Sequence, residues 1–254
     1  MDKIKLLIRS DDLGYSEAVN YGLEKALRFG MTKSVGLMPN MPAAPHGVAL
    51  VKDLDICLGQ HTNICVGKPV SDPARIPSML SPNGEFKPSR EYRAATEDFV
   101  VLEEAILEVE AQYHRFKELV GREPGYFEGH AVRSPNFIKA MEIVADSHGL
   151  KFSGMYMPGV PTARVGKGET YRCMMNSMAP DYDAVQSLKD AVLSAKTDLP
   201  SIYVCHPGYV DDYLMRTSSL NLNRTKEVAM LTDPAVKAWL EDHNVELITY
   251  DDIK

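Results

Sequence analysis

Two adjacent carboxylates, Asp11 and Asp12, stand where an apolar run near the start of the chain stops. Successive side chains of a strand point to opposite faces, so the two Asp residues need not have the same role. One of them could form an Asx turn or a helix cap, but Ser16 already has the position of the cap. Two carboxylates held close together also need a cation or a hydrogen-bond donor nearby to ionise freely. The pair alone is a weak signal of metal or acid–base chemistry.

Three histidines strengthen this signal, because His61, His130 and His206 each end or follow an apolar run. In a parallel barrel, residues that carry out chemistry collect where strands end. A single histidine is more often a hydrogen-bonded structural residue, but several polar stretches at strand ends together favour a functional site. These stretches are Asp11-Asp12, His61 with Asn63, Glu128 with His130, and His206. The other histidines, which we interpret as structural or exposed, are His46, His114, His148 and His243.

One carboxylate and two imidazoles form a facial site for a divalent ion and leave positions open for water and substrate. A second carboxylate could take a proton from that water, and a histidine across the pocket could give one to a leaving group. Nitrogen ligands suit zinc or another transition metal better than magnesium, which prefers oxygen. The residue types therefore favour a metal-dependent hydrolase.

An alternation of strands and helices positions these residues. Strands are expected at 4–9, 34–38, 55–61, 126–131, 150–155, 201–205 and 245–250. Helices are expected at 16–30, 42–53, 94–120, 135–148, 183–197, 224–231 and 233–243. Irregular stretches are expected at 66–92, at 156–180 with a strand at 171–175, and at 207–222. We expect the first two stretches to cover the pocket and to select the substrate, because long loops in compact domains are commonly functional.

This alternation predicts an α/β fold, an irregular (β/α) barrel with a mainly parallel sheet. No composition break marks a linker, so a single domain over 1–254 is expected. The alternative is an open doubly wound sheet, but no glycine-rich phosphate-binding fingerprint follows the first strand.

Composition narrows the class of protein further. The chain has 254 residues, 44% of them hydrophobic and 25% charged, as in ordinary soluble proteins. A formal net charge of −7 argues against nucleic acid or an anionic membrane as a partner. No apolar run is long enough for a membrane span, and the start is typical of a strand rather than a signal peptide. The cysteines form no C-x-x-C pair, and we expect a cytoplasmic protein with reduced thiols.

Several motifs resemble the YdjC-like carbohydrate deacetylases. They are Arg9-Ser10-Asp11-Asp12-Leu13-Gly14-Tyr15-Ser16, Leu58-Gly59-Gln60-His61-Thr62-Asn63, Glu128-Gly129-His130 and Cys205-His206-Pro207-Gly208-Tyr209. The stretches Arg224-Thr225-Lys226-Glu227 and Glu246-Leu247-Ile248-Thr249-Tyr250 are also similar to that family. The resemblance spans nearly the whole chain. It implies an irregular barrel, a divalent metal commonly assigned as magnesium, and removal of acetyl groups from N-acetylated sugars such as chitooligosaccharides.

By this resemblance, Asp12, His61 and His130 are metal ligands, Asp11 is the base and His206 is the acid. The chain departs from the family's usual Asn-Ala at Arg9-Ser10 and from its usual Asp-Ser-His at Glu128-Gly129-His130. The further histidines that usually follow the third motif are also replaced. The candidate substrate-binding residues are Asn63, Arg9, Glu128 and Arg133. We expect both arginines near the pocket mouth, where they bind an anionic group such as a sugar phosphate or form ion pairs with Glu128 or an Asp.

Two other function classes stay open: a sugar- or metal-binding regulator without turnover, and a glycosidase with Asp11 and Glu128 as its carboxylate pair. A measurement of bound metal separates the glycosidase, which needs none, from the deacetylase. A measurement of acetate release separates the regulator from the deacetylase. The expected partner is a small acetylated sugar, and a homodimer is compatible with the sequence, which does not determine the oligomeric state.

Overall fold

The computed structural model describes residues 3–155, 159–173 and 176–253. In this part of the chain, eight strands form one curled sheet. Seven of them lie in the order β4 (Phe127–Gly129), β3 (Cys57–Thr62), β2 (Ser34–Leu37), β1 (Ile4–Leu13), β7 (Ser201–Cys205), β6 (Gly168–Arg172) and β5 (Thr162–Val165). The eighth, β8 (Val245–Ile248), lies off this path and pairs with β1. All pairs are parallel except β5 with β6.

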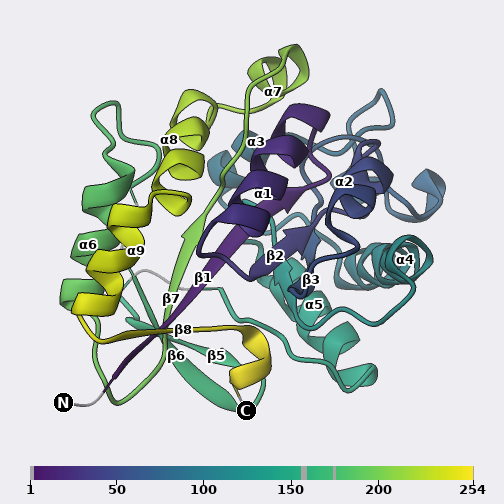
Figure 1. Ribbon diagram of the computed structural model, residues 1–254. Helices are drawn as coiled ribbons and strands as arrows, with labels where there is room; N and C mark the ends of the chain where they lie inside the picture. The colour runs from purple at the N-terminus through teal and green to yellow at the C-terminus, as the bar shows by residue number, and fades with distance from the viewer. Residues whose placement is uncertain (1–2, 156–158, 174–175, 254) are drawn as a thin grey trace.

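Strand β1 is central because it pairs with three other strands. Residues 6–10 pair with β7 along one edge. Along the other edge, residues 4–7 pair with β8, and β2 takes over from Arg9 onward. Figure 1 shows β1 running from the N-terminus into the middle of the molecule.

Residues 151–154 bridge the two edge strands of this sheet. On the β4 side, Phe127 N–H donates to the Lys151 carbonyl and Ser153 N–H donates to the Phe127 carbonyl, both at 2.8 Å. On the β5 side, Gly154 N–H donates to the Arg164 carbonyl at 2.8 Å. The prediction of an irregular (β/α) barrel is confirmed, and the open doubly wound alternative is wrong.

Helices cover the outside of the sheet. In Figure 1, one group lies to the right of β1 and the other to the left. The right-hand group is α1 (Glu17–Phe29), α2 (Ala44–Val51), α4 (Leu102–Val120) and α5 (Pro135–Ser147), and the left-hand group is α6 (Ala184–Ser194), α8 (Leu222–Leu231) and α9 (Pro234–Asp242). Short helices are α3 (Ser89–Ala94) and α7 (Asp212–Thr217), with single 3-10 turns at Pro73–Arg75, Pro77–Met79 and Tyr250–Asp252.

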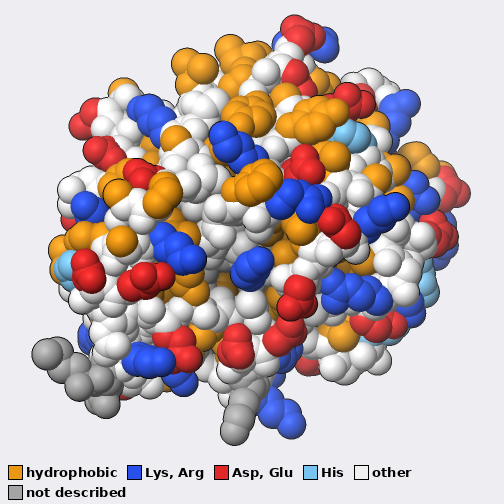
Figure 2. Space-filling model, viewed as in Figure 1, with side chains coloured by type: hydrophobic (Ala, Val, Ile, Leu, Met, Phe, Trp, Pro, Cys, Tyr) orange, Lys and Arg blue, Asp and Glu red, His pale blue; other side chains and the backbone are white. Residues whose placement is uncertain are grey.

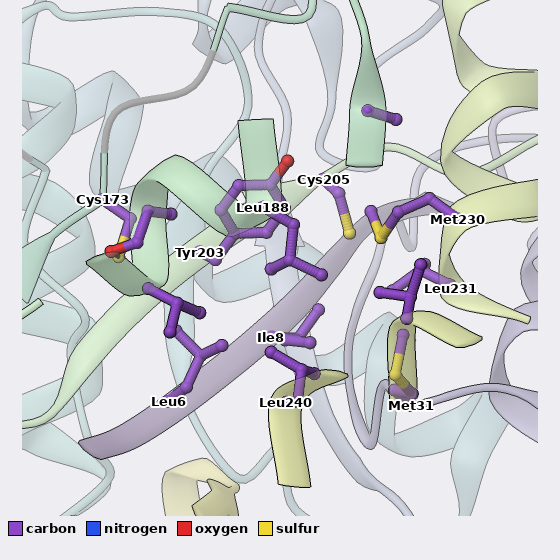
Figure 3. Close-up of a cluster of buried hydrophobic side chains, with 14 of the residues drawn as sticks. Leu6, Ile8, Met31, Cys173, Leu188, Tyr203, Cys205, Met230, Leu231 and Leu240 are labelled. Carbon is purple, nitrogen blue, oxygen red and sulfur yellow. Dashed lines mark hydrogen bonds between the residues drawn. The ribbon is translucent and has the colours of Figure 1, made fainter. Parts of the chain in front are cut away.

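The alternation of side chains along β1 separates a helix-facing core from the barrel interior. Leu6 and Ile8 pack with side chains of β7, α6, α8 and α9 (Figure 3). Leu7 points the other way and packs with Tyr126 and Tyr250 inside the barrel. Because strand side chains repeat every two residues, Arg9 and Asp11 follow Leu7 toward the interior. The burial of the apolar side chains of β1 thus determines which of its polar side chains face the pocket.

Several predicted boundaries were wrong. The first strand does not stop at residue 9 but continues through both Asp residues to Leu13. The helix expected over 94–120 begins only at Leu102. Asp98 is in the segment that is not helical, and its Oδ1 atom accepts from Val100 N–H at 3.2 Å, a local turn that competes with helical backbone bonds. Its Oδ2 atom accepts from Ser134 Oγ and Asn136 N–H at the start of α5, both at 2.9 Å, which ties this segment to the neighbouring helix.

The expected strand at 150–155 contributes only isolated bridges, at Phe152 and Ser153. Residues 174 and 175 of the strand expected at 171–175 lie outside the described residues, and Tyr171 and Arg172 belong to β6 of the hairpin β5–β6. The stretch 207–222 contains α7, which was not predicted. All strands in the described part of the chain join one sheet, and the single domain over 1–254 stays a prediction.

All four cysteines are buried and free. Among the described residues, no helix is long and apolar enough to cross a membrane. Lys, Arg, Asp and Glu side chains are interspersed on the face shown in Figure 2, so this face carries no extended patch of one sign.

Candidate active site

A bulge in β1 places both Asp residues at the site. Ser10 pairs with Val35 and Leu13 pairs with Leu37, so Asp11 and Asp12 stand against Gly36 alone. Two residues opposite one is the pattern of a β-bulge, which redirects side chains. Asp12 accordingly has a φ of 79°, a left-handed conformation that is uncommon for a non-glycine residue and often occurs at functional sites.

Gly36 leaves the space that these side chains occupy. A Cβ atom at this position would lie 2.8 Å from Glu128 Oε1, 3.0 Å from His61 Cβ and 3.2 Å from Asp11 Oδ1. Because contacts below 3.0 Å require a neighbour to move, any other residue here would displace the site.

Three ligand-type atoms form a nearly equilateral triangle. His61 Nε2 and His130 Nδ1 lie 2.9 Å apart, and each lies 3.1 Å from Asp12 Oδ1. Ligands at right angles around an ion about 2.1 Å away would be separated by about 3.0 Å. Asp12 Oδ1 is buried and accepts no hydrogen bond of good geometry from a described residue. The residues present therefore fit one divalent ion.

Glu128 orients His61 within this triangle. Its Oε1 atom contacts His61 Nδ1, which leaves Nε2 facing Asp12 and His130. A carboxylate on the far nitrogen of a metal-binding histidine commonly fixes the tautomer and raises the basicity of the ligand.

Arg9 holds two carboxylates on the floor of the pocket. Its Nε and Nη2 atoms each lie 2.8 Å from an oxygen of Asp11, and Nη2 also lies 3.3 Å from Glu128 Oε2. Nη1 donates to Tyr250 Oη at 3.1 Å. Asp11, His61 and Glu128 also lie close enough to hold an ion, but the guanidinium of Arg9 already pairs with both carboxylates of this group. Arg9 is thus largely buried in ion pairs with Asp11 and Glu128, which is the ion-pair alternative that the sequence had left open for this residue.

Two residues of α8, Arg224 and Glu227, support the site and were not assigned a role from sequence. Arg224 Nη2 donates to Asp12 Oδ2 at 2.7 Å. Glu227 Oε2 accepts from the backbone N–H of His206 at 2.6 Å. Both side chains are only 1% exposed. The motif that contains them was visible, and their charge within an otherwise apolar helix face was the signal that could have identified them.

Burial and neighbouring charges set the protonation states. Burial acts to raise the pKa of Asp12, but Arg224 and His130 hold it well below its usual value. Burial raises the pKa of Asp11, opposed by Arg9. For His130, burial is outweighed by Asp12, and the pKa is raised to about 9. Burial lowers the pKa of His206 to about 4, so this imidazole is neutral near pH 7.

A pocket opens above these groups, and most predicted site residues line it. They are Arg9, Asp11, His61, Glu128, His130, Arg133 and His206, and Asp12 lies buried beneath. The pocket is also lined by Ser153, Met155, Ile202 and Val204. Asn63 does not line the pocket, because its amide is bound to Cys65 N–H, Val66 and Asn40. The stretch 66–92 contributes no lining residue, so the prediction that it covers the pocket is wrong.

The histidines interpreted as structural or exposed lie elsewhere. His114 and His148 contact Glu110, His46 contacts Asn20, and His243 contacts the Trp239 carbonyl.

Comparison with known proteins identifies relatives over almost the full length. The YdjC-like protein family matches residues 5–242. A carbohydrate deacetylase of Geobacillus stearothermophilus is 33% identical over 96% of this chain and 96% of its own. A chitooligosaccharide deacetylase of Klebsiella pneumoniae is 28% identical over 98% of each chain.

Solved structures share the fold. An Enterococcus faecalis protein, provisionally described as a cellobiose-phosphate cleavage protein, has a TM-score of 0.81 and 21% identity over 98% of both chains. A family 4 acetyl xylan esterase of Clostridium thermocellum, in complex with cobalt, has a TM-score of 0.52 and 11% identity over 98% of this chain and 89% of its own. At these identities the likeness concerns the fold alone.

Proposed function

Since the chain belongs to the YdjC-like family, we propose that it is a hydrolase that removes the acetyl group from an N-acetylated sugar. The observation that carries this proposal is the triangle of Asp12, His61 and His130 beside Asp11 and His206 in one pocket. The names of the relatives support the same class of reaction. Chitooligosaccharides are the first substrates to test.

One divalent ion would be held by Asp12, His61 and His130, where it would polarise the acetyl carbonyl and acidify a water molecule. Magnesium is the expectation from the family, whereas the two nitrogen ligands favour zinc or another transition metal. Cytoplasmic location and a homodimer stay predictions from sequence.

The chain's own residues handle the protons. Asp11 faces the pocket with its carboxylate fixed by Arg9 and can accept the proton of the attacking water. The departing amine needs one proton. His206 is neutral at rest, so it acts as an acid only after it receives a proton, and it can pass on the one that the water has lost. Hydrolysis then consumes one water and releases acetate and the free amine.

The glycosidase alternative has less support from the geometry. Asp11 and Glu128 have oxygens within 4.8 Å of one another. Retaining pairs are typically about 5–5.5 Å apart and inverting pairs about 6.5–9.5 Å. Both carboxylates also contact one guanidinium, and Glu128 is further engaged by His61.

The proposed function is tested by acetate release from N-acetylated chitooligosaccharides, with protein stripped of metal and then reloaded with Zn²⁺, Co²⁺ or Mg²⁺. We expect acetate in equimolar amounts with new amine groups, and only after reloading. Binding of sugar without acetate release would favour the regulator, and release of reducing ends by the stripped protein would favour the glycosidase.

We further propose that Arg133 recognises an anionic group on the sugar. This side chain is exposed, lines the pocket and forms no ion pair with a described residue, in contrast to Arg9. Arg133→Gln should raise KM for a sugar phosphate about 10-fold or more, since charge-assisted hydrogen bonds contribute roughly 1.5–3 kcal/mol. The KM for the unphosphorylated sugar should not change. Equal effects on both substrates, or on neither, would contradict the assignment.

A further inference from the structure

Helix α8 carries two buried ionisable side chains, an arginine and a glutamate, that approach the site from behind. Arg224 and Glu227 are three residues apart, so they lie on the same face of the helix, and both are 1% exposed. Charged groups are rarely buried unless they are paired, because desolvation is costly. Their partners therefore indicate what the helix holds in place.

Arg224 contacts both strand ends that carry the site. Its Nη2 atom donates to Asp12 Oδ2 at 2.7 Å, and Nη1 donates to the His206 carbonyl at 3.4 Å. Nε donates to the Leu220 carbonyl at 2.7 Å, which ties the guanidinium to the start of its own helix. One side chain thus spans the gap between Asp12 on β1 and the residue after β7.

Glu227 holds His206 from the other side. Its Oε2 atom accepts from His206 N–H at 2.6 Å, and Oε1 accepts from Tyr182 Oη at 2.9 Å. The second contact fixes the direction of the carboxylate. Neither Arg224 nor Glu227 lines the pocket, so both can act only through the groups that they hold.

The sheet itself does not determine how Asp12 and His206 are placed relative to each other. The last register pair between β1 and β7 is Ser10 with Cys205. His206 follows the end of that ladder, and Asp12 comes after a bulge. Past the last pair, backbone hydrogen bonds between β1 and β7 no longer fix the separation of the two segments that carry Asp12 and His206.

We propose that α8 sets this separation, with Arg224 as the positioning residue for Asp12 and Glu227 as the positioning residue for His206. The proposal rests on the proposed function, because it assigns Asp12 to metal binding and His206 to proton transfer. It gives a role to the motif Arg224-Thr225-Lys226-Glu227.

The test compares two substitutions at position 227 that separate reach from charge. Glu227→Gln keeps the length and an acceptor oxygen, whereas Glu227→Asp keeps the carboxyl group but is shorter by one methylene group. If position matters, the Glu227→Gln variant retains most of kcat, and the Glu227→Asp variant loses about 10- to 100-fold in kcat with little change in KM. Thr225→Ala is the matched control, because Thr225 is only half-buried on the same helix and its side chain donates to the Leu222 carbonyl, away from the site.

Calorimetric titration of the stripped variants with Co²⁺ supplies a readout that does not depend on turnover. Arg224→Lys should weaken Co²⁺ binding about 10- to 100-fold, and both Glu227 variants should bind Co²⁺ within about twofold of wild type. Equal loss of Co²⁺ affinity in the Arg224 and Glu227 variants, or a Glu227→Asp variant more active than the Glu227→Gln variant, would overturn the proposal. If wild type releases no acetate, the proposed function fails, while the Co²⁺ comparison still decides the role of Arg224.

Discussion

Asp12→Asn is expected to abolish tight binding of a divalent ion, with a loss of affinity beyond the roughly 10- to 100-fold that follows removal of an outer partner. Asp12 is the one anionic member of the triangle with His61 and His130. An amide oxygen keeps the shape but not the charge. Acetate release should fall with the loss of the ion, and calorimetric titration of the stripped protein with Zn²⁺ or Co²⁺ measures the affinity directly.

The same substitution also affects folding stability, because it leaves Arg224 without its charged partner. Breaking a buried ion pair typically costs about 3–5 kcal/mol. The titrations should therefore be carried out at a temperature below the thermal unfolding midpoint of the metal-free variant, which circular dichroism measures. Asp11→Asn is the matched control, since it removes the neighbouring carboxylate, which also pairs with an arginine. If the Asp12→Asn variant binds Zn²⁺ as tightly as the Asp11→Asn variant does, the ligand assignment is contradicted.

Asp11→Asn is expected to lower kcat for acetate release by about 10²–10⁴-fold, or roughly 3–5 kcal/mol of barrier, while the ion still binds. The carboxylate lines the pocket, and burial raises its pKa, which makes it a better proton acceptor. Arg9 keeps its contacts with Glu128 and Tyr250 in the variant, so the floor of the pocket should persist. Single-turnover acetate release with metal-loaded protein measures the effect.

His206→Ala provides the comparison for this second prediction. If both residues transfer protons in the same reaction, each variant should be slow and the double variant should be little slower than the worse single one. Near-normal turnover of the Asp11→Asn variant on a verified acetylated substrate would show that the base lies elsewhere.

Much of the framework was predictable from local patterns. Strand and helix alternation follows from hydrophobic periodicity, which depends on neighbouring residues only. The histidines at strand ends and the YdjC-like motifs led to the family, and the match over residues 5–242 confirms it. His61 and His130 could be predicted from the sequence to lie in one site, because the carboxyl ends of parallel strands lie at the same edge of the sheet.

Errors arose where a polar side chain has a partner that the hydrophobic pattern does not reveal. Asp98 accepts hydrogen bonds from Val100 and from the start of α5 in a segment that is not helical, and Asn63 binds its own loop rather than the pocket. The sequence left open whether Arg9 binds an anionic group or pairs with a carboxylate, and the alternation set by buried Leu7 carries it inward to Asp11. Each contact depends on which face of an element is buried, and a single stretch of sequence does not reveal that.

The order of strands and helices, the class of fold and the residue types that could bind a metal were all accessible from the sequence, since they follow from local periodicity and side-chain chemistry. Two features became visible only in the folded chain: the bulge that brings Asp11 and Asp12 to one site, and the contact of Arg224 with Asp12 across 212 positions of sequence. Bulges and buried ion pairs form between segments whose proximity depends on the packing of the entire sheet. Their geometry exists only once the chain has folded.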